Sequence, residues 1–224
     1  MARILYLPGL GADQRLFSEL EQHLAGTCPK WPQPGDSNLA QYAEKCIEAW
    51  EVSAEDVLVG FSFGAQVALE IQHNFQQSGG NMPFVAMISG IGTSRELDPE
   101  FKNRVRMMAF CPDLLLRWLF VLLGPWHALR GSKINSSQRH MLSAMAKSMD
   151  LSFFRWAANA CANWQFEPRR LKLLRINGRN DTVIPFEEDS VDWIVEHGAH
   201  LIVYTHAEAI AQRILAALGE TNHG

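Results

Sequence analysis

Cysteine is scarce in this sequence, and the few cysteines present are not grouped. Among 224 residues there are four, Cys28, Cys46, Cys111 and Cys161, with no CxxC pair and no regular spacing. Scattered cysteines favour free thiols over a disulfide framework or a zinc site. We therefore predict neither structural disulfides nor a cysteine-based metal site.

An excess of positive charge is also missing. Lysine and arginine together number 20 against 24 aspartates and glutamates, which gives a formal net charge of −4. A chain without an overall basic field is a poor candidate for binding nucleic acid. We predict no nucleic-acid partner.

Long hydrophobic runs are absent as well. Only four apolar residues separate the initial Met-Ala-Arg from Pro8, too few for the core of a secretory signal. The most apolar stretch, residues 114–129, is interrupted by Arg117, Gly124 and Pro125 and falls short of the roughly 20 apolar residues of a membrane span. We predict a cytoplasmic protein with no stable membrane insertion; interfacial association of this stretch is the alternative.

What the sequence does contain, at both ends, is an alternation of strand-like and helix-like segments. Apolar and β-branched runs predict strands at residues 4–7, 57–59, 83–89 and 171–176, with a weaker pattern at 191–195. Apolar residues at helical spacing predict helices at residues 13–24, 39–50 and 207–218, and directly after residue 62. Repeated alternation favours the α/β class, a mostly parallel sheet with helices on both faces.

The middle of the chain breaks this alternation. Residues 93–167 show a helical pattern rich in Leu, Met, Phe and Trp, and no convincing strand. An all-helical block between two strands of an α/β sheet indicates an insertion. We predict a core formed by residues 1–92 and 168–224, with a helical cap over residues 93–167.

A GxSxG motif at residues 60–64 lies between a predicted strand and a predicted helix. A serine on such a sharp turn projects its hydroxyl above the sheet, and the flanking glycines let the strand and the helix approach closely. This arrangement is the nucleophile elbow of serine hydrolases. Ser62 is the candidate nucleophile, and it needs a neighbouring base that is oriented by a third group.

Candidates for both groups follow in the expected order, first an acid and then a histidine. Asp181 follows the strand predicted at 171–176, at the edge where α/β sheets place functional groups; the alternative is a turn-capping aspartate. Of His197, His200 and His206, we favour His200, because it lies in a loop before the terminal helix and can reach the elbow. His206 is the alternative base. A metal site built from all three histidines lacks a fourth ligand.

Attack on an ester carbonyl creates an oxyanion, which needs backbone N–H donors held in place. The N–H of Phe63, directly after the nucleophile, is one candidate. The loop Leu-Pro-Gly-Leu-Gly-Ala at residues 7–12 can present a second, from Leu10. The alternative, a phosphate-binding loop, is disfavoured because neither GxGxxG nor GxxxxGK[ST] is present.

Together these motifs resemble the α/β-hydrolase superfamily, in particular small bacterial carboxylesterase-like hydrolases, including the pimeloyl-ester esterase type. The resemblance is carried by the loop at 7–17, the elbow at 60–64, Gly-Arg-Asn-Asp at 178–181 and Gly-Ala-His at 198–200. It implies a minimal fold of about six strands, because the chain starts at what is usually the third strand.

The resemblance implies a serine hydrolase that cleaves a small-molecule carboxylic ester or thioester through an acyl-enzyme. Ser62 attacks, His200 transfers the proton, Asp181 orients His200, and the N–H groups of Leu10 and Phe63 hold the oxyanion. It implies no metal and no other cofactor. The alternatives are a ligand-binding protein with a silent triad, and a lyase or acyltransferase on the same scaffold.

Aromatic residues in the predicted cap suggest an apolar acyl or aryl group. Trp118 and Phe120 are the candidate pocket residues, because their stretch is more apolar than an exposed helix should be. We expect them to face the space above Ser62. The alternative is that the aromatic residues form the core of the cap itself.

Overall fold

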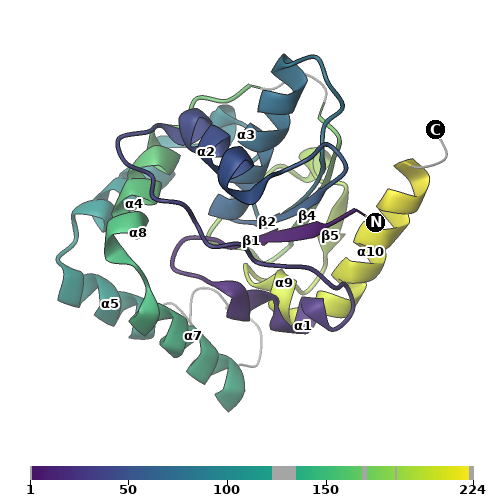
Figure 1. The fold of residues 1–224 in the computed structure, drawn as a ribbon. Coiled ribbons are helices and arrows are strands. Elements are labelled where there is room, and N and C mark those ends of the chain that lie inside the picture. Colours follow the sequence, from purple (N-terminus) through teal and green to yellow (C-terminus); the bar gives the residue numbers. More distant parts are fainter. Residues whose placement is uncertain (1, 123–134, 168–170, 185, 222–224) are drawn as a thin grey trace.

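The computed structural model describes residues 2–122, 135–167, 171–184 and 186–221, and the statements below concern these residues. At its centre lies a parallel five-stranded sheet in the order β1-β2-β3-β4-β5 (Figure 1). The strands are β1 (Ile4–Leu7), β2 (Val57–Phe61), β3 (Phe84–Ile88), β4 (Leu173–Gly178) and β5 (Trp193–Val195). The α/β class is confirmed. The resemblance implied about six strands, and the sheet has five. Each of the five overlaps a segment whose apolar pattern predicts a strand.

Helices cover both faces of the sheet (Figure 1). Those outside the predicted cap are η1 (Gln14–Phe17), α1 (Ser18–Glu21), α2 (Leu39–Trp50), α3 (Phe63–Gln77), η3 (Glu188–Ser190), α9 (Ile202–Thr205) and α10 (Ala207–Thr221). Leu58 packs in the core cluster with α2 and α3, whereas its neighbour Val59 packs in the cluster with α1, α9 and α10. This alternation follows from the period of two in a strand.

The segment between β3 and β4 contains helices and no strand among its described residues, and we call residues 93–167 the cap segment. Its elements are η2 (Ser94–Glu96), α4 (Pro99–Phe110), α5 (Asp113–Leu122), α7 (Ser136–Ser148) and α8 (Leu151–Ala162). Helix α4 packs against α8, and α5 packs against α7. All four α-helices lie on one side of the sheet in Figure 1.

The two ends of the cap segment are joined to each other and to the sheet. The backbone N–H of Ser94 donates to the carbonyl of Phe166 at 2.9 Å, and Arg95 forms an exposed ion pair with Glu167. Arg175 of β4 is buried and forms an ion pair with Glu96. The cap segment therefore leaves and re-enters the sheet at one anchored joint.

Among the described residues, no helix has the length and hydrophobicity of a membrane-spanning segment. Residues 123–129 of the apolar stretch singled out in the sequence lie outside the described part of the chain.

Candidate active site

The turn between β2 and α3 holds Ser62 in a backbone conformation that side-chain-bearing residues rarely adopt. Its φ and ψ are 53° and −117°, and its N–H donates to the carbonyl of Ile88 at 3.0 Å. The glycine in the motif's last position is required by close packing, because a Cβ atom at Gly64 would lie 1.9 Å from the carbonyl oxygen of Leu7. Strained conformations of this kind cluster at functional sites.

Asp181 and His200 lie in contact at the same end of the sheet. The Nδ1 of His200 is 2.8 Å from Asp181 Oδ2, and the Asp181 side chain is fully buried. The other carboxylate oxygen, Oδ1, accepts the N–H groups of Val183 at 2.8 Å and Ile184 at 3.0 Å. These bonds fix the carboxylate, which in turn fixes the orientation of the imidazole ring.

Backbone hydrogen bonds hold the loop that contains Asp181 against the segment that leads to His200. The N–H of Asn180 donates to Gly198 at 2.8 Å, and the N–H of Arg179 donates to Val195 at 3.0 Å. The ring of His200 packs against that of Phe61, the residue before Ser62, with a centroid distance of 4.9 Å. Among the described residues no hydrogen bond links Ser62 to His200; such bonds are often long before substrate binds.

The other two histidines do not join this group. His206 lies between α9 and α10, with its Nδ1 2.8 Å from Thr205 Oγ1. Burial lowers the pKa of His206, and the proximity of His197 lowers it further. The described residues contain no cluster of three or more His, Cys, Asp or Glu side chains able to hold a metal ion.

The loop after β1 passes directly beside Ser62. A Cβ atom at Gly9 would lie 3.0 Å from the Cβ of Ser62. Ala12 donates its N–H to the carbonyl of Gly9 at 3.1 Å, and Gly11 has a φ of 74°, the pattern of a type II turn. This turn bond does not use the N–H of Leu10. Across the site, Phe63 is the first residue of α3, where backbone N–H groups lack partners within the helix.

A cavity of about 160 Å³ opens between this loop and the cap segment. It is lined by Gly9, Gly11, Ala12, Asp13, Trp31, Pro32, Gln33, Met145, Ser148, Met149, Asp150, Phe153 and Phe154. Trp31 connects it to the elbow, with ring centroids 5.9 Å from Phe63 and 5.7 Å from Phe153. The sequence analysis did not single out Trp31, because no local pattern around it signals a contact with the distant residue Phe153.

The two predicted pocket residues lie in different surroundings, although both belong to α5. Trp118 is 57% exposed and does not line the cavity. Phe120 does not line the cavity either, but it is half-buried and its ring reaches the loop: a Cβ atom at Gly11, which does line the cavity, would lie 3.2 Å from that ring. Its ring also packs edge-on against Phe154, with centroids 5.3 Å apart.

Solved structures with this architecture are known. The chain superimposes on a thermophilic esterase from Thermogutta terrifontis with a TM-score of 0.76 and 15% identity, over 98% of this chain and 90% of the other. A bromoperoxidase from Bacillus anthracis gives 0.68 and 15%, over 98% and 92%. The RedJ thioesterase of prodiginine biosynthesis in Streptomyces coelicolor gives 0.62 and 16%, over 94% and 84%.

The chain has the α/β-hydrolase fold. No family model matches it, and neither does any curated protein sequence. Identities of 15–16% establish the fold alone, so the activity of this α/β-hydrolase-fold protein has to be argued from its own residues.

Proposed function

We propose that the protein is a serine hydrolase that cleaves a carboxylic ester or thioester of a small molecule. The contact between Asp181 and His200 is the observation that carries this proposal, because it joins two residues 19 positions apart at the sheet edge that also holds Ser62. The esterase and the thioesterase among the similar folds support the same class of reaction.

In the proposed mechanism, His200 removes the proton of Ser62 as its hydroxyl attacks the carbonyl carbon of the substrate. The negative charge that develops on the carbonyl oxygen is held by the N–H groups of Leu10 and Phe63. Asp181 keeps the Nδ1 proton of His200 in place and stabilises the imidazolium. His200 then gives the proton to the leaving alcohol or thiol, which leaves an acyl group on Ser62. A water molecule, deprotonated by His200, attacks this acyl group, and His200 returns the proton to Ser62 as the acid product leaves.

The cavity beside Gly9 is the proposed site for the apolar part of the substrate. Its volume is below the roughly 300–1,000 Å³ of sites for drug-sized ligands, which favours a small acyl or aryl group. Its aromatic walls, Trp31, Phe153 and Phe154, provide the apolar surface. We propose Phe120 as part of its boundary near Gly11.

Replacement of the nucleophile tests the proposal. Ser62→Ala should lower kcat on p-nitrophenyl esters by about 10³-fold or more, and His200→Ala should be nearly as damaging, because the two residues act as a unit. His197→Ala and His206→Ala are matched controls and should keep most of the activity. Circular dichroism checks that each variant is folded.

Covalent labelling separates this proposal from a binding protein with a silent triad. A fluorophosphonate probe should label the wild type at Ser62 and leave Ser62→Ala unlabelled. Absence of labelling in the wild type would favour the binding protein. Retention of more than a tenth of the esterase activity by Ser62→Ala would remove that residue from its role.

A further inference from the structure

The loop that carries Leu10 ends at an ion pair. Asp13 accepts the backbone N–H of Arg15 at 3.0 Å and the Nε of its guanidinium at 2.9 Å, which starts η1. Burial by itself raises the pKa of Asp13, but hydrogen bonds and charge from Arg15 outweigh this and lower it. Asp13 is therefore ionised at neutral pH and fixes the direction in which the loop leaves the site.

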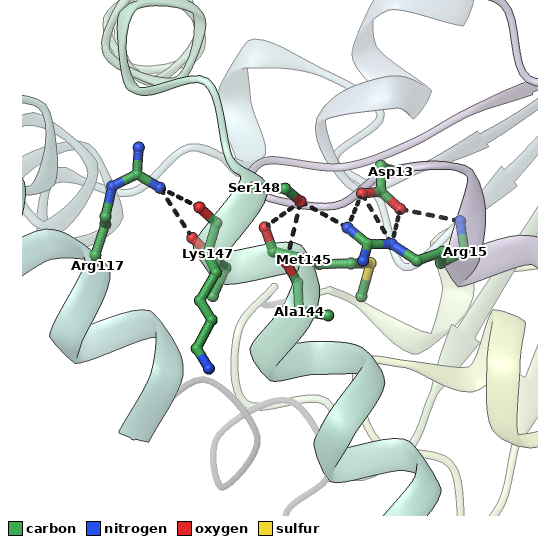
Figure 2. Close-up of polar contacts among 8 residues, drawn as sticks. Asp13, Arg15, Arg117, Ala144, Met145, Lys147 and Ser148 are labelled. Atoms are coloured by element: carbon green, nitrogen blue, oxygen red, sulfur yellow. Dashed lines mark hydrogen bonds and ion pairs between the residues drawn. The ribbon is translucent and has the colours of Figure 1, made fainter.

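Arg15 also reaches across to the cap segment. Its Nη2 donates to the hydroxyl of Ser148 at 2.6 Å, and that hydroxyl donates to the carbonyls of Ala144 at 3.0 Å and Met145 at 3.2 Å (Figure 2). Ser148 is the last residue of α7 and lines the cavity. One hydroxyl thus joins the end of a cap helix to the end of the loop.

Directly after Ser148, the cap segment packs on the loop itself. A Cβ atom at Gly11 would lie 3.1 Å from Met149 Sδ, and the ring of Phe120 lies at a similar distance. Met149 is buried. The turn next to Leu10 is consequently held by an apolar contact above Gly11 and by the polar link through Arg15.

We propose that the cap segment positions the oxyanion donor: Arg15 with Ser148, and Met149 on Gly11, hold the loop so that the N–H of Leu10 faces the reacting carbonyl. This inference rests on the proposed function and adds a coupling between cap and catalysis. Arg15, Ser148 and Met149 are positioning residues, since they act through the loop.

The proposal has a kinetic signature. An oxyanion donor interacts with charge that exists only in the transition state, so a loosened donor lowers kcat and leaves KM nearly unchanged. Loss of a whole donor costs about 10²–10³-fold in kcat. Because the link through Ser148 is exposed, we expect a smaller effect, about three- to tenfold, when it is removed.

The test compares Ser148→Ala, Arg15→Gln and the double variant with Arg117→Gln as the matched control. Arg117 of α5 donates to the carbonyl of Lys147 at 2.7 Å, so it holds the same end of α7 from within the cap segment and does not touch the loop (Figure 2). The measurements are kcat, KM and the inhibition constant of methylboronic acid. This inhibitor is too small to fill the cavity that Ser148 lines, and its adduct with Ser62 places an oxygen where the oxyanion forms.

We expect Ser148→Ala and Arg15→Gln to lower kcat with little change in KM, and to weaken boronic acid binding by the same factor. The double variant should be no worse than Arg15→Gln, because both changes break one link. Arg117→Gln should match the wild type within about twofold.

A loss of kcat in Arg117→Gln equal to that in Ser148→Ala and Arg15→Gln would overturn the proposal, because it would indicate general loosening of the cap segment. So would wild-type kcat in both Ser148→Ala and Arg15→Gln. If Ser62→Ala is itself active, the proposed function fails with it. An inactive Ser62→Ala beside unaffected Ser148→Ala and Arg15→Gln removes the positioning role alone.

A further variant tests the apolar contact between Met149 and Gly11. Met149→Ala should lower kcat more than Ser148→Ala does, since it removes a buried side chain from Gly11. Because Met149 also lines the cavity, the deciding readout is the binding of methylboronic acid, which is too small to fill that space. Unchanged binding of this inhibitor would remove Met149 from the proposal.

Discussion

Glu70 of α3 is a carboxyl group in an apolar environment, at 5% exposure. One of its oxygens accepts the indole N–H of Trp164 at 2.7 Å. Burial raises the pKa of Glu70 to about 7, although the bond from Trp164 partly opposes this. The folded protein therefore holds this proton across a range of pH in which the unfolded chain has released it.

Because the pKa of Glu70 differs between the folded and unfolded states, the free energy of unfolding depends on pH. Between about pH 4.5, the ordinary value for the group, and about pH 7, the folded state binds more protons, so the free energy of unfolding falls as pH rises. Glu70→Gln keeps an acceptor for Trp164 and removes the ionisation. We expect it to be more stable than the wild type near pH 8, by up to about 3 kcal/mol, with no such gain near pH 5.

Urea unfolding at both pH values measures this effect. Glu208→Gln on the exposed face of α10 is the control, and it should show no such dependence on pH. An equal gain for Glu70→Gln at both pH values would contradict the raised pKa.

At the same scale, short motifs after strands led to the prediction of Ser62, Asp181 and His200 as site residues. The structure places Asp181 and His200 in contact, and the catalytic roles of all three residues stay predictions. The sequence could not indicate Trp31 or Met149. Their places at the cavity depend on how the cap segment packs against the core, and a single side chain in a turn or between two helices carries no local pattern for that.

At the scale of elements, the joint of the cap segment depends on one buried ion pair. Arg175 Nη1 lies 3.1 Å from Glu96 Oε1, and the Arg175 side chain is 5% exposed. Removal of one partner of a buried ion pair costs about 3–5 kcal/mol, because the other charge stays buried. Without Glu96, the Arg175 side chain keeps only neutral partners among the described residues, the carbonyl of Gly90 at 3.2 Å and the hydroxyl of Ser190 at 3.1 Å. We expect Glu96→Gln to lower the free energy of unfolding by an amount of this order, as measured by urea denaturation.

Glu167→Gln is the matched control, because it breaks the exposed pair with Arg95 at the same joint. Exposed ion pairs contribute little, so this variant should unfold like the wild type. Similar losses in the two variants would mean that the burial of Arg175 is not what makes Glu96 important.

The elements themselves were predicted unevenly. Helix α2 was predicted at its observed bounds, Leu39–Trp50, where a capping box between Asn38 and Gln41 marks the start. The helix predicted at 13–24 is instead a 3-10 turn followed by one α-helical turn. Buried Leu16 and Leu20 satisfy either geometry, because spacings of three and four residues do not separate the two. Helix α9 is too short to give a periodic signal.

At the scale of the whole molecule, the cavity between core and cap segment predicts a limit on substrate length. Each buried methylene contributes about 0.8 kcal/mol, or roughly fourfold in kcat/KM, until the space is filled. In a series of p-nitrophenyl esters, activity should rise over a few carbons and then fall. Phe120→Ala should move the optimum to longer chains, because its ring borders Gly11.

Trp118→Ala is the control for this series, since its side chain is mostly exposed and does not line the cavity. It should leave the optimum where it is. A flat profile, or equal shifts in both variants, would place the acyl group elsewhere.

The arrangement of the whole molecule was only partly predictable. Strand patterns and motif order indicated the α/β class. The exposure of Trp118 on α5 was not predictable, because it depends on how that helix packs and not on the apolar composition of residues 114–129. The cytoplasmic location stays a prediction.

The hydrogen bond between Ser94 and Phe166 brings the two ends of the cap segment together, which bears on whether the segment can be replaced. Because the two ends of the cap segment meet there, the core needs only a short span to connect β3 to β4. The segment is therefore exchangeable as one cassette: recombination or design could replace it while leaving Ser62, Asp181 and His200 untouched. If Ser148 and Met149 position the loop as proposed, a foreign segment would need residues of its own that contact the loop at Gly11.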